Sequence, residues 1–164
     1  MKAIVSVTKD WGIGLKGKLL VRNPVDMRFF KDNTMCGTVV CGQTTFLSFP
    51  GGALEGRRNV VLSIDPTFAA KGAEVVHSLD EALAAVKDDD PERVWVIGGE
   101  SVYRQLLPHC SHVLVTKNDV VLDADAFFPN LDEDPDWSVE STTVGGVTKA
   151  GIPFEFVTYV NKGA

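Results

Sequence analysis

The sequence predicts an α/β fold: a single domain over residues 1–164, with a central mixed, mostly parallel β-sheet that is flanked by helices and extended by a C-terminal antiparallel ribbon. Short apolar runs without a polar face recur along the chain and are typical of strands covered on both sides. Helical patterns separate these runs, which favours parallel strands joined by crossover helices. After Trp137, apolar and polar residues alternate on both sides of a glycine-containing turn, as in an antiparallel ribbon.

The chain opens with a strand at residues 3–7, predicted from the apolar run AIVSV. The polar, glycine-rich stretch 8–18 is expected to be a loop, and a loop after the first strand of such a sheet lies at the edge where ligands bind. Asn23 and Pro24 mark the start of a helix that runs to about Asn33, because Asn is a good N-cap and Pro suits the first helical turn.

The next part of the chain continues the alternation of strands and helices. An apolar run ending in glycine predicts a strand at 38–42, and a short helix follows at 43–48. The segment 49–58 is rich in Pro and Gly and is expected to be a loop. Further strands are expected at 59–63 and 73–76.

The centre of the predicted sheet lies in the segment 94–107, VWVIGGESVYRQLL, which has the pattern of a strand, a paired-glycine turn and a helix. Before it, Ser78 and Glu81 form a capping-box pattern that opens a helix running to about Lys87. After it, an apolar run predicts a strand at 112–116.

The C-terminal part contains the predicted ribbon. A connecting loop is expected at 120–129, and the acidic run 131–136 is typical of solvated surface. The alternating segments 137–144 and 153–160 then form the two strands of the ribbon.

Composition excludes several classes of protein. Lys and Arg number 16 against 22 Asp and Glu, so the net charge is −6 and the pI about 5.0, which predicts no attraction to nucleic acid or to an anionic membrane. No signal-peptide or membrane-spanning pattern is present. Cys36, Cys41 and Cys110 are an odd, scattered set that suits reduced thiols, and the run 109–112 lacks the spacing of a zinc site. We therefore expect a cytoplasmic protein without a metal.

Two features indicate a ligand site at the carboxyl edge of the sheet. Gly98 and Gly99 let the backbone turn sharply after a central strand, and the helix behind them presents free N–H groups to an anion. Asp26 lies on one helical face with the apolar Met27 and Phe30. Each feature also has a simpler interpretation: a glycine pair is often an ordinary turn, and an acidic residue stabilises the first turn of a helix.

Several motifs together carry a family resemblance that none of them carries alone. In chain order they are Gly12-Ile13-Gly14, Asn23-Pro24-Val25-Asp26, Phe30-Lys31, Thr34, Gly42, Thr45, Leu54-Glu55-Gly56-Arg57, Val96-Ile97-Gly98-Gly99, Tyr103, Thr116, Asp125 and Phe128-Pro129. In order and spacing this set resembles dihydrofolate reductase over essentially the whole chain. The resemblance implies reduction of 7,8-dihydrofolate to tetrahydrofolate by hydride from NADPH, a step that supplies one-carbon metabolism and is the target of antifolate inhibitors.

The resemblance also implies roles for individual residues. Asp26, with Thr116 as its hydrogen-bonding partner, orients the pterin and favours its protonation, and Leu19 is implied as a further catalytic residue. Arg57 holds the α-carboxylate of the substrate's glutamate tail by a two-pronged bond. The implied substrate site consists of Ile4, Val5, Asp26, Met27, Phe30, Phe49, Leu54, Arg57, Ile97, Tyr103 and Thr116.

The resemblance also implies a cofactor site, in which Gly98, Gly99 and the turn at Thr45 carry the dinucleotide. The peptide bond between Gly98 and Gly99 is expected to be cis, and the segment 8–20 is expected to close over the nicotinamide and exclude water. The residues implied in cofactor binding are Ser6, Ile13, Gly14, Gly17, Gly42, Gln43, Thr44, Thr45, Leu62, Ser63, Ile64, Ile97, Gly98, Gly99, Glu100, Ser101, Val102 and Tyr103.

The sequence departs from the family pattern at two places. Leu20-Val21 stands where the family has Pro-Trp, so the wall beside the pterin is smaller and lacks an N–H donor. The three positions that commonly hold the 2′-phosphate of NADPH read Gln43, Ile64 and Ser101, which carry no charge. Ser63, His77 and Arg58 are the remaining candidates for this contact. We therefore expect a weakened preference for NADPH over NADH.

Two rival functions remain open from the sequence. One is a relative of the same fold that reduces a ribosylated pyrimidine in riboflavin synthesis, although Asp26 and Arg57 favour the folate enzyme. The other is a folate- or nucleotide-binding module that has lost catalysis. We expect a monomer that binds dihydrofolate and antifolates, and neither nucleic acid nor membrane.

Overall fold

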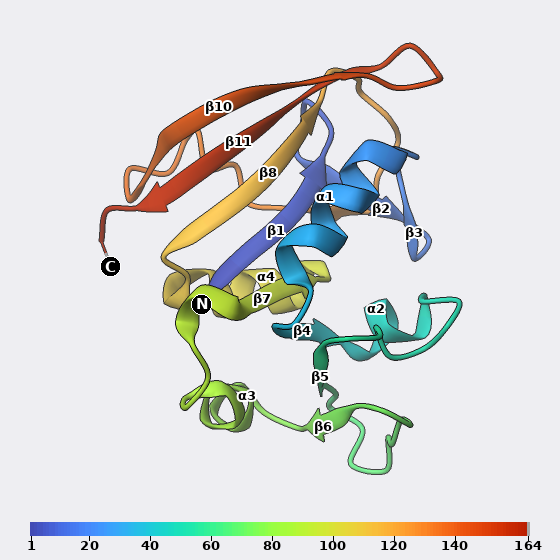
Figure 1. Cartoon of the computed structure of the whole chain (residues 1–164), viewed down its shortest axis with the longest axis vertical. Helices are drawn as coiled ribbons and strands as arrows, with labels where there is room; N and C mark the ends of the chain where they lie inside the picture. The colour runs from blue at the N-terminus through green and yellow to red at the C-terminus, as the bar shows by residue number, and fades with distance from the viewer. Residues whose placement is uncertain (164) are drawn as a thin grey trace.

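The computed structural model describes residues 1–163, and it confirms an α/β architecture built on one large sheet (Figure 1). The six strands at its centre and lower edge run parallel to one another, and the last two strands add an antiparallel ribbon. In spatial order the strands of this sheet are β10 (Trp137–Val147), β11 (Pro153–Asn161), β8 (His112–Asn118), β1 (Lys2–Val7), β7 (Val94–Gly98), β4 (Thr38–Gly42), β5 (Arg58–Leu62) and β6 (Glu74–Val76).

Helices α1 and α3 begin where local capping residues predict. In α1 (Pro24–Thr34) the side chain of Asn23 accepts a hydrogen bond from the Asp26 amide at 3.1 Å. In α3 (Leu79–Val86) Ser78 Oγ accepts from the Glu81 amide at 3.1 Å. The remaining helical segments are α2 (Gln43–Leu47), α4 (Glu100–Leu106) and the 3₁₀ turns η1 (Pro91–Arg93) and η2 (Leu107–His109).

Alternation along the strands divides the core between the two faces of the sheet. Ile4, Val39 and Trp95 point to one face, where they pack with Phe29 and Phe30 of α1. The residues between them on the same strands point to the other face, where α3 and α4 lie. Among residues 1–163, no helix is both long and apolar enough to cross a membrane.

The prediction that residues 8–18 form a loop is wrong in part. Strands β2 (Gly12–Leu15) and β3 (Lys18–Leu19) form a hairpin in this segment, and β9 (Ala126–Phe127) completes a second small sheet. The register pairs Gly12 with Phe127 and Gly14 with Ala126. These partners are more than a hundred residues apart, and the two segments, of four and two residues, are too short to show the alternation of a strand in the sequence. The connecting loop predicted at 120–129 is likewise wrong at the two residues of β9.

Candidate functional site

Asp26 lies in the first turn of α1 and faces the central sheet. Its Oδ1 accepts a hydrogen bond of 2.5 Å from the hydroxyl of Thr116, a fully buried residue of β8. The expected pairing of these two residues is therefore confirmed. The bond joins residues 90 positions apart in the chain, so the fold, and not local sequence, holds the carboxylate in place.

The electrostatic setting of Asp26 combines opposing effects. Removal from water raises the pKa of the carboxyl group, and the hydrogen bonds from Thr116 and Ser6 lower it. The effect of burial is the largest, so the pKa of Asp26 is raised. A carboxyl group in this state can exchange a proton nearer to neutral pH than an exposed aspartate can.

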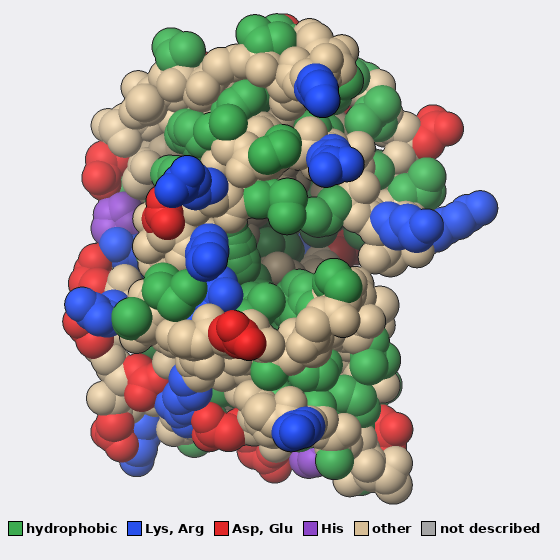
Figure 2. All heavy atoms as spheres, turned by 45° about the vertical axis from the view of Figure 1, so that its right-hand side comes forward, with side chains coloured by type: hydrophobic (Ala, Val, Ile, Leu, Met, Phe, Trp, Pro, Cys, Tyr) green, Lys and Arg blue, Asp and Glu red, His purple; other side chains and the backbone are tan. Residues whose placement is uncertain are grey.

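Asp26 opens onto a cavity of about 220 Å³ between the end of β1, the β2–β3 hairpin and the start of α1. Figure 2 shows a hollow in this face of the molecule with hydrophobic side chains around it. Predicted site residues in its wall are Ser6, Ile13, Leu19 and Met27. The wall also contains Val7, Thr8, Gly12, Leu20, Val21, Arg22 and Asn23.

The apolar residues predicted for the substrate site lie beyond this cavity, on the α1 side of the sheet. Phe30, Leu54 and Ile97 pack on the cluster formed by Ile4, Val39 and Trp95. Phe49 and Ile97 pack on the neighbouring cluster beside α2. Val5 differs, because its side chain points to the opposite face and joins the core under α4.

Arg57 lies at the far end of α1 from Asp26. Its Nη1 donates to Thr34 Oγ1 at 3.1 Å, and its Nε donates to the carbonyl of Glu55 at 3.1 Å. Partial burial of the guanidinium lowers the pKa of Arg57. Asp26 and Thr34 are eight positions apart, which separates them by about 12 Å along the helix axis. A ligand lying along α1 therefore meets a carboxylate at one end and a guanidinium at the other.

Gly98, the last residue of β7, and Gly99 lie so close to neighbouring side chains that a Cβ at either position would be crowded. The peptide bond between Gly98 and Gly99 is cis, as expected. A Cβ on Gly98 would approach the Tyr103 ring to 3.2 Å, and one on Gly99 would approach Thr45 Oγ1 to 3.2 Å. Bare main chain is thus presented where β4 and β7 end, beside Gly42, as a dinucleotide site requires.

Tyr103 and Glu100 make contacts that tie this edge to the rest of the molecule. The Tyr103 hydroxyl donates to the carbonyl of Ile4 at 2.7 Å, and the residue is buried. Glu100 Oε1 accepts from the Phe127 amide at 2.6 Å, so its carboxylate holds β9. Val102 is buried in the core, which leaves only its main chain for a ligand.

The positions implied for a 2′-phosphate lie at the ends of β4, β5 and β7. Ser63 Oγ donates to Gln43 Oε1 at 2.5 Å, while Ile64 is 96% exposed. Ser101 is exposed and accepts a hydrogen bond from Gln105 at 3.0 Å. Thr44 is exposed next to Gln43, and Leu62 is buried at the end of β5. Gly17 lies exposed in the turn of the β2–β3 hairpin.

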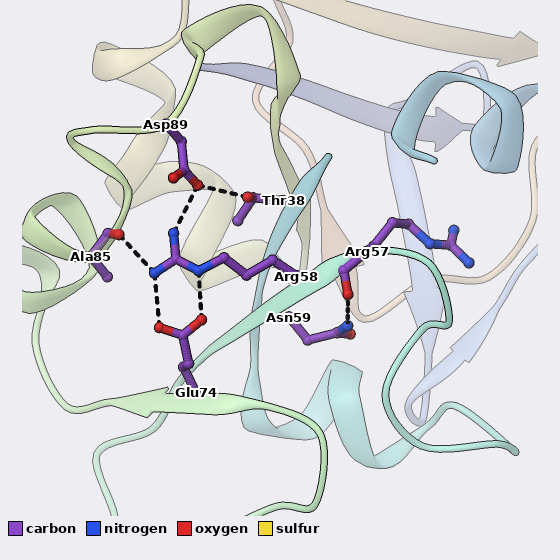
Figure 3. Close-up of polar contacts among 7 residues, drawn as sticks. All are labelled: Thr38, Arg57, Arg58, Asn59, Glu74, Ala85 and Asp89. Carbon is purple, nitrogen blue, oxygen red and sulfur yellow. Dashed lines mark hydrogen bonds and ion pairs between the residues drawn. The ribbon is translucent and has the colours of Figure 1, made fainter. Parts of the chain in front are cut away.

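Arg58, one of the three residues considered as compensating contacts for the 2′-phosphate, is not available for that contact. Its guanidinium is engaged by Glu74, Asp89 and the carbonyl of Ala85, on the side of β5 away from Arg57 (Figure 3). Successive residues of an extended strand point to opposite sides, so adjacent arginines at its start have different surroundings. His77 remains near Ser63, with Nδ1 2.9 Å from the Ser63 carbonyl oxygen.

The sequence did not predict the contacts that Thr34 and Asn23 make at this site. Thr34 was part of the motif set, but its contact with Arg57 depends on the distance between α1 and the turn before β5. Asn23 was recognised as a helix cap, and the structure also places it in the wall of the Asp26 cavity. A polar residue at a helix start next to a candidate acid is the signal that could have drawn attention to it.

Comparisons with known proteins agree on one family. The model of the family described as dihydrofolate reductase matches residues 1–161. The chain is 36% identical to a dihydrofolate reductase of Neisseria gonorrhoeae, covering 97% of this chain and 96% of the relative. It is 41% identical to that of Mycobacterium tuberculosis, covering 90% and 89%.

A solved structure gives the same result. The dihydrofolate reductase of Enterococcus faecalis, complexed with NADP(H) and RAB-propyl, superposes with a TM-score of 0.88 at 32% identity, covering 98% of this chain and 95% of that one. The chain belongs to the dihydrofolate reductase family.

Proposed function

We propose that this chain reduces 7,8-dihydrofolate to 5,6,7,8-tetrahydrofolate with NADPH, and that Asp26 is its catalytic acid group. Family membership supports the reaction and the nicotinamide cofactor. The observation that carries the assignment of residues is the pair of opposite charges, Asp26 and Arg57, at the two ends of α1 with an apolar surface between them.

Asp26 is suited to bind and protonate a pterin. A pterin ring presents a ring nitrogen and an exocyclic amine side by side, and one carboxylate can accept a hydrogen bond from each. With Thr116 holding Oδ1, the carboxyl group keeps a fixed orientation toward the cavity. Because burial raises its pKa, Asp26 can favour the protonated substrate beside the carbon that receives hydride, directly or through water.

Arg57 is suited to bind the other end of the same substrate. The aminobenzoyl ring of dihydrofolate would pass over Phe30 and Leu54, which lie between the two charged ends. The substrate's α-carboxylate would then meet the guanidinium of Arg57. Such a two-pronged, charge-assisted contact fixes position as well as adding affinity.

The glycine edge is suited to hold the cofactor. Gly42, Gly98 and Gly99 expose main chain at the ends of β4 and β7, and Thr45 adds a hydroxyl beside Gly99. NADPH supplies the hydride when bound. The β2–β3 hairpin, with Leu19 79% exposed at the mouth of the cavity, is placed to exclude water from the reacting groups.

A spectrophotometric assay of dihydrofolate reduction tests this proposal. We expect turnover by the native chain and, at pH 7, a fall of about 10²-fold or more in kcat for Asp26→Asn, the range typical of losing an acid–base group. The loss should shrink at acid pH, where solvent protonates the substrate. Equal turnover by Asp26→Asn at neutral pH would contradict the role of Asp26.

The same assay separates the rival functions. A reductase of ribosylated pyrimidines would ignore dihydrofolate and oxidise NADPH only with its own substrate. A binding module would bind folate and cofactor without loss of absorbance at the nicotinamide wavelength. Dihydrofolate-dependent NADPH oxidation excludes both.

We further propose that the preference for NADPH over NADH is weak. Gln43, Ile64 and Ser101 offer no positive charge, Arg58 is engaged elsewhere, and Asp65 adds a carboxylate at this edge. A charge-assisted hydrogen bond contributes about 1.5 to 3 kcal/mol, so the absence of one costs about tenfold or more in affinity. Steady-state kinetics with each cofactor measure the ratio directly, and a strong preference for NADPH would contradict the proposal.

We also propose that the protein is a single-domain monomer of the cytoplasm that binds antifolates at the substrate site. The free cysteines Cys36, Cys41 and Cys110 support a reducing compartment, and burial raises the pKa of the Cys41 and Cys110 thiols to about 12. Light scattering would give the mass in solution. A dimer mass at assay concentration would contradict the monomer.

A further inference from the structure

The turn at residues 54–57 carries two of the proposed substrate contacts, Leu54 and Arg57. It contains Gly56 at φ 74°, the left-handed region, and a Cβ there would meet the sulfur of Met35. The Gly56 carbonyl accepts from the Cys36 amide at 2.9 Å. The turn has no helix or strand hydrogen bonds of its own, so its shape depends on contacts from neighbouring residues.

Asn59 provides the contacts that close this turn. Its Nδ2 donates to the carbonyl oxygens of Leu54 and Arg57, each at 3.0 Å, and its Oδ1 accepts from the Leu54 amide at 2.9 Å. The side chain is 4% exposed, on the second residue of β5. Both amide N–H groups are therefore used, and they join the first and last residues of the turn to the sheet.

The direction of the Arg57 side chain follows from the position of its main chain. Figure 3 shows Asn59 bonded to the Arg57 carbonyl, with the Arg57 side chain extending away from the cluster around Arg58. Within residues 1–163, two of the five guanidinium N–H groups of Arg57 are occupied, by Thr34 and Glu55. Three N–H groups remain for a carboxylate. They can form a two-pronged bond only while the turn holds the guanidinium at a fixed place.

We propose that Asn59 is a positioning residue for recognition of the substrate tail: its side-chain amide fixes the turn so that Leu54 and Arg57 meet the ring and the α-carboxylate together. This role rests on the proposed function, in which Arg57 binds that carboxylate. Asn59 touches no substrate and acts only through the main chain of the turn. Its effect is therefore confined to substrates that have a tail.

The test compares two substrates in Asn59→Ser, whose side chain is too short to span the turn. For dihydrofolate we expect KM to rise about tenfold, as when one charge-assisted bond is weakened, and kcat to change less than about twofold. For a 7,8-dihydropterin with a methyl group in place of the tail, kcat/KM should stay within about twofold of the parent. Equal losses for both substrates would overturn the proposal.

A double-mutant cycle tests the route through Arg57. Arg57→Leu should raise KM for dihydrofolate, and adding Asn59→Ser to it should raise KM much less than Asn59→Ser does alone, because the contact of Arg57 is already lost and only that of Leu54 remains to be disturbed. Independent, additive effects would overturn the proposal. An unchanged KM in Arg57→Leu would instead remove the proposed role of Arg57, and this inference with it.

Two further variants guard against a general loss of structure. Asn59→Asp keeps the Oδ1 acceptor but sets oxygen against two carbonyls, and it should give the same KM effect if Asn59→Ser does not fold. Thr38→Val removes a buried hydroxyl at the start of the neighbouring strand β4. This hydroxyl donates to Asp89 at 2.7 Å, a bond that lies outside the turn. It should lower the melting temperature and leave KM for dihydrofolate unchanged. A KM rise in Thr38→Val as large as in Asn59→Ser would overturn the proposal.

Discussion

At the residue scale, Asp26 combines two opposing influences that can be measured as stability. The positive end of α1 and the hydroxyl of Thr116 favour the ionised carboxylate, while removal from water disfavours it. Burial is the larger effect and the pKa is raised. The folded protein therefore holds this proton more tightly than the unfolded chain does, which makes Asp26 a destabilising group at neutral pH.

The sign of the pH dependence follows from that difference. Below the ordinary pKa of 3.8 the group is protonated in both states and costs nothing. As pH rises from 3.8 through the raised pKa, only the unfolded chain ionises freely, so the free energy of unfolding falls. Above that window the loss is constant. Asp26→Asn should therefore be more stable than the parent at pH 7, although it is less active, and the gain should vanish near pH 3.

Denaturant unfolding of both proteins across this pH range measures the effect. The parent at pH 3 is the internal reference, because there both side chains are neutral. A variant that is less stable than the parent at pH 7 would mean that the hydrogen bond from Thr116 outweighs burial. Enzyme active sites commonly contain groups that lower the free energy of unfolding in this way.

At the element scale, the cap of α1 links helix stability to the site. Asn23 accepts from the Asp26 amide, so Asn23→Ala should lower the free energy of unfolding by about 1 kcal/mol. The same change loosens the turn that carries Asp26, so KM for dihydrofolate should rise. Asn23→Asp keeps the capping oxygen and should retain most of the stability. Urea unfolding and steady-state kinetics on the same preparations give both quantities.

Helix α3 offers a matched control for this prediction. Its cap, Ser78, makes the equivalent bond to the Glu81 amide, and α3 lies at the lower edge of the sheet, away from α1 (Figure 1). Ser78→Ala should cost a similar free energy of unfolding and leave KM for dihydrofolate unchanged. If both alanine variants raised KM equally, loss of stability alone would explain the effect.

The elements that could be predicted from the sequence are those whose signals are local. Asn23 and Pro24 predict the start of α1, and Ser78 with Glu81 predicts that of α3, because caps act within one turn. At α3 the capping box differs from the expected one in one bond. The side chain of Glu81 accepts a hydrogen bond from the His77 amide at 2.8 Å, and not from the Ser78 amide. Strands β2, β3 and β9 could not be predicted, because each is only two to four residues long and the pairing of β2 with β9 joins segments far apart in the chain.

The residues of the site also divide into those that the sequence could identify and those that only the folded structure reveals. The family motifs place Asp26 beside Thr116, and the structure confirms their bond. The sequence cannot say which of two adjacent arginines is free to meet a ligand, because that depends on which side of β5 each one faces. Nor does it reveal Asn59, a single polar residue at the start of an apolar strand, whose three bonds exist only when the turn folds back on β5.

At the scale of the whole molecule, the cluster around Arg58 holds one edge of the sheet. Arg58 is paired with Glu74 of β6 and with Asp89 after α3, and Asp89 also accepts from Thr38 of β4 (Figure 3). Strand β6 has only three residues, so few main-chain bonds attach this edge to β5. The ion pairs of Arg58 therefore join β5 to β6 and to the segment after α3, and the hydrogen bond from Thr38 to Asp89 connects β4 to the same cluster.

Arg58→Met should destabilise the protein without changing its kinetics, because this side chain points away from Arg57. The cluster is partly exposed, so after allowance for solvent screening we expect a loss of order 1–2 kcal/mol at pH 7. The hydrogen bond from Arg58 is the main reason that the pKa of Glu74 is lowered. Its stabilising effect is present above the ordinary pKa of 4.5 and is lost as pH falls through the lowered pKa.

The difference between parent and Arg58→Met should thus be full at pH 7 and shrink on acidification, the reverse of the trend expected for Asp26→Asn. Lys9→Met, which removes a more exposed pair with Asp119, should leave stability unchanged at both pH values. Thermal unfolding followed by circular dichroism and by tryptophan fluorescence should show one shared transition in every variant, because the proposed single domain would lose this edge together with its core. An earlier, separate transition in Arg58→Met would show that β5, β6 and α3 unfold independently, and would contradict a single domain.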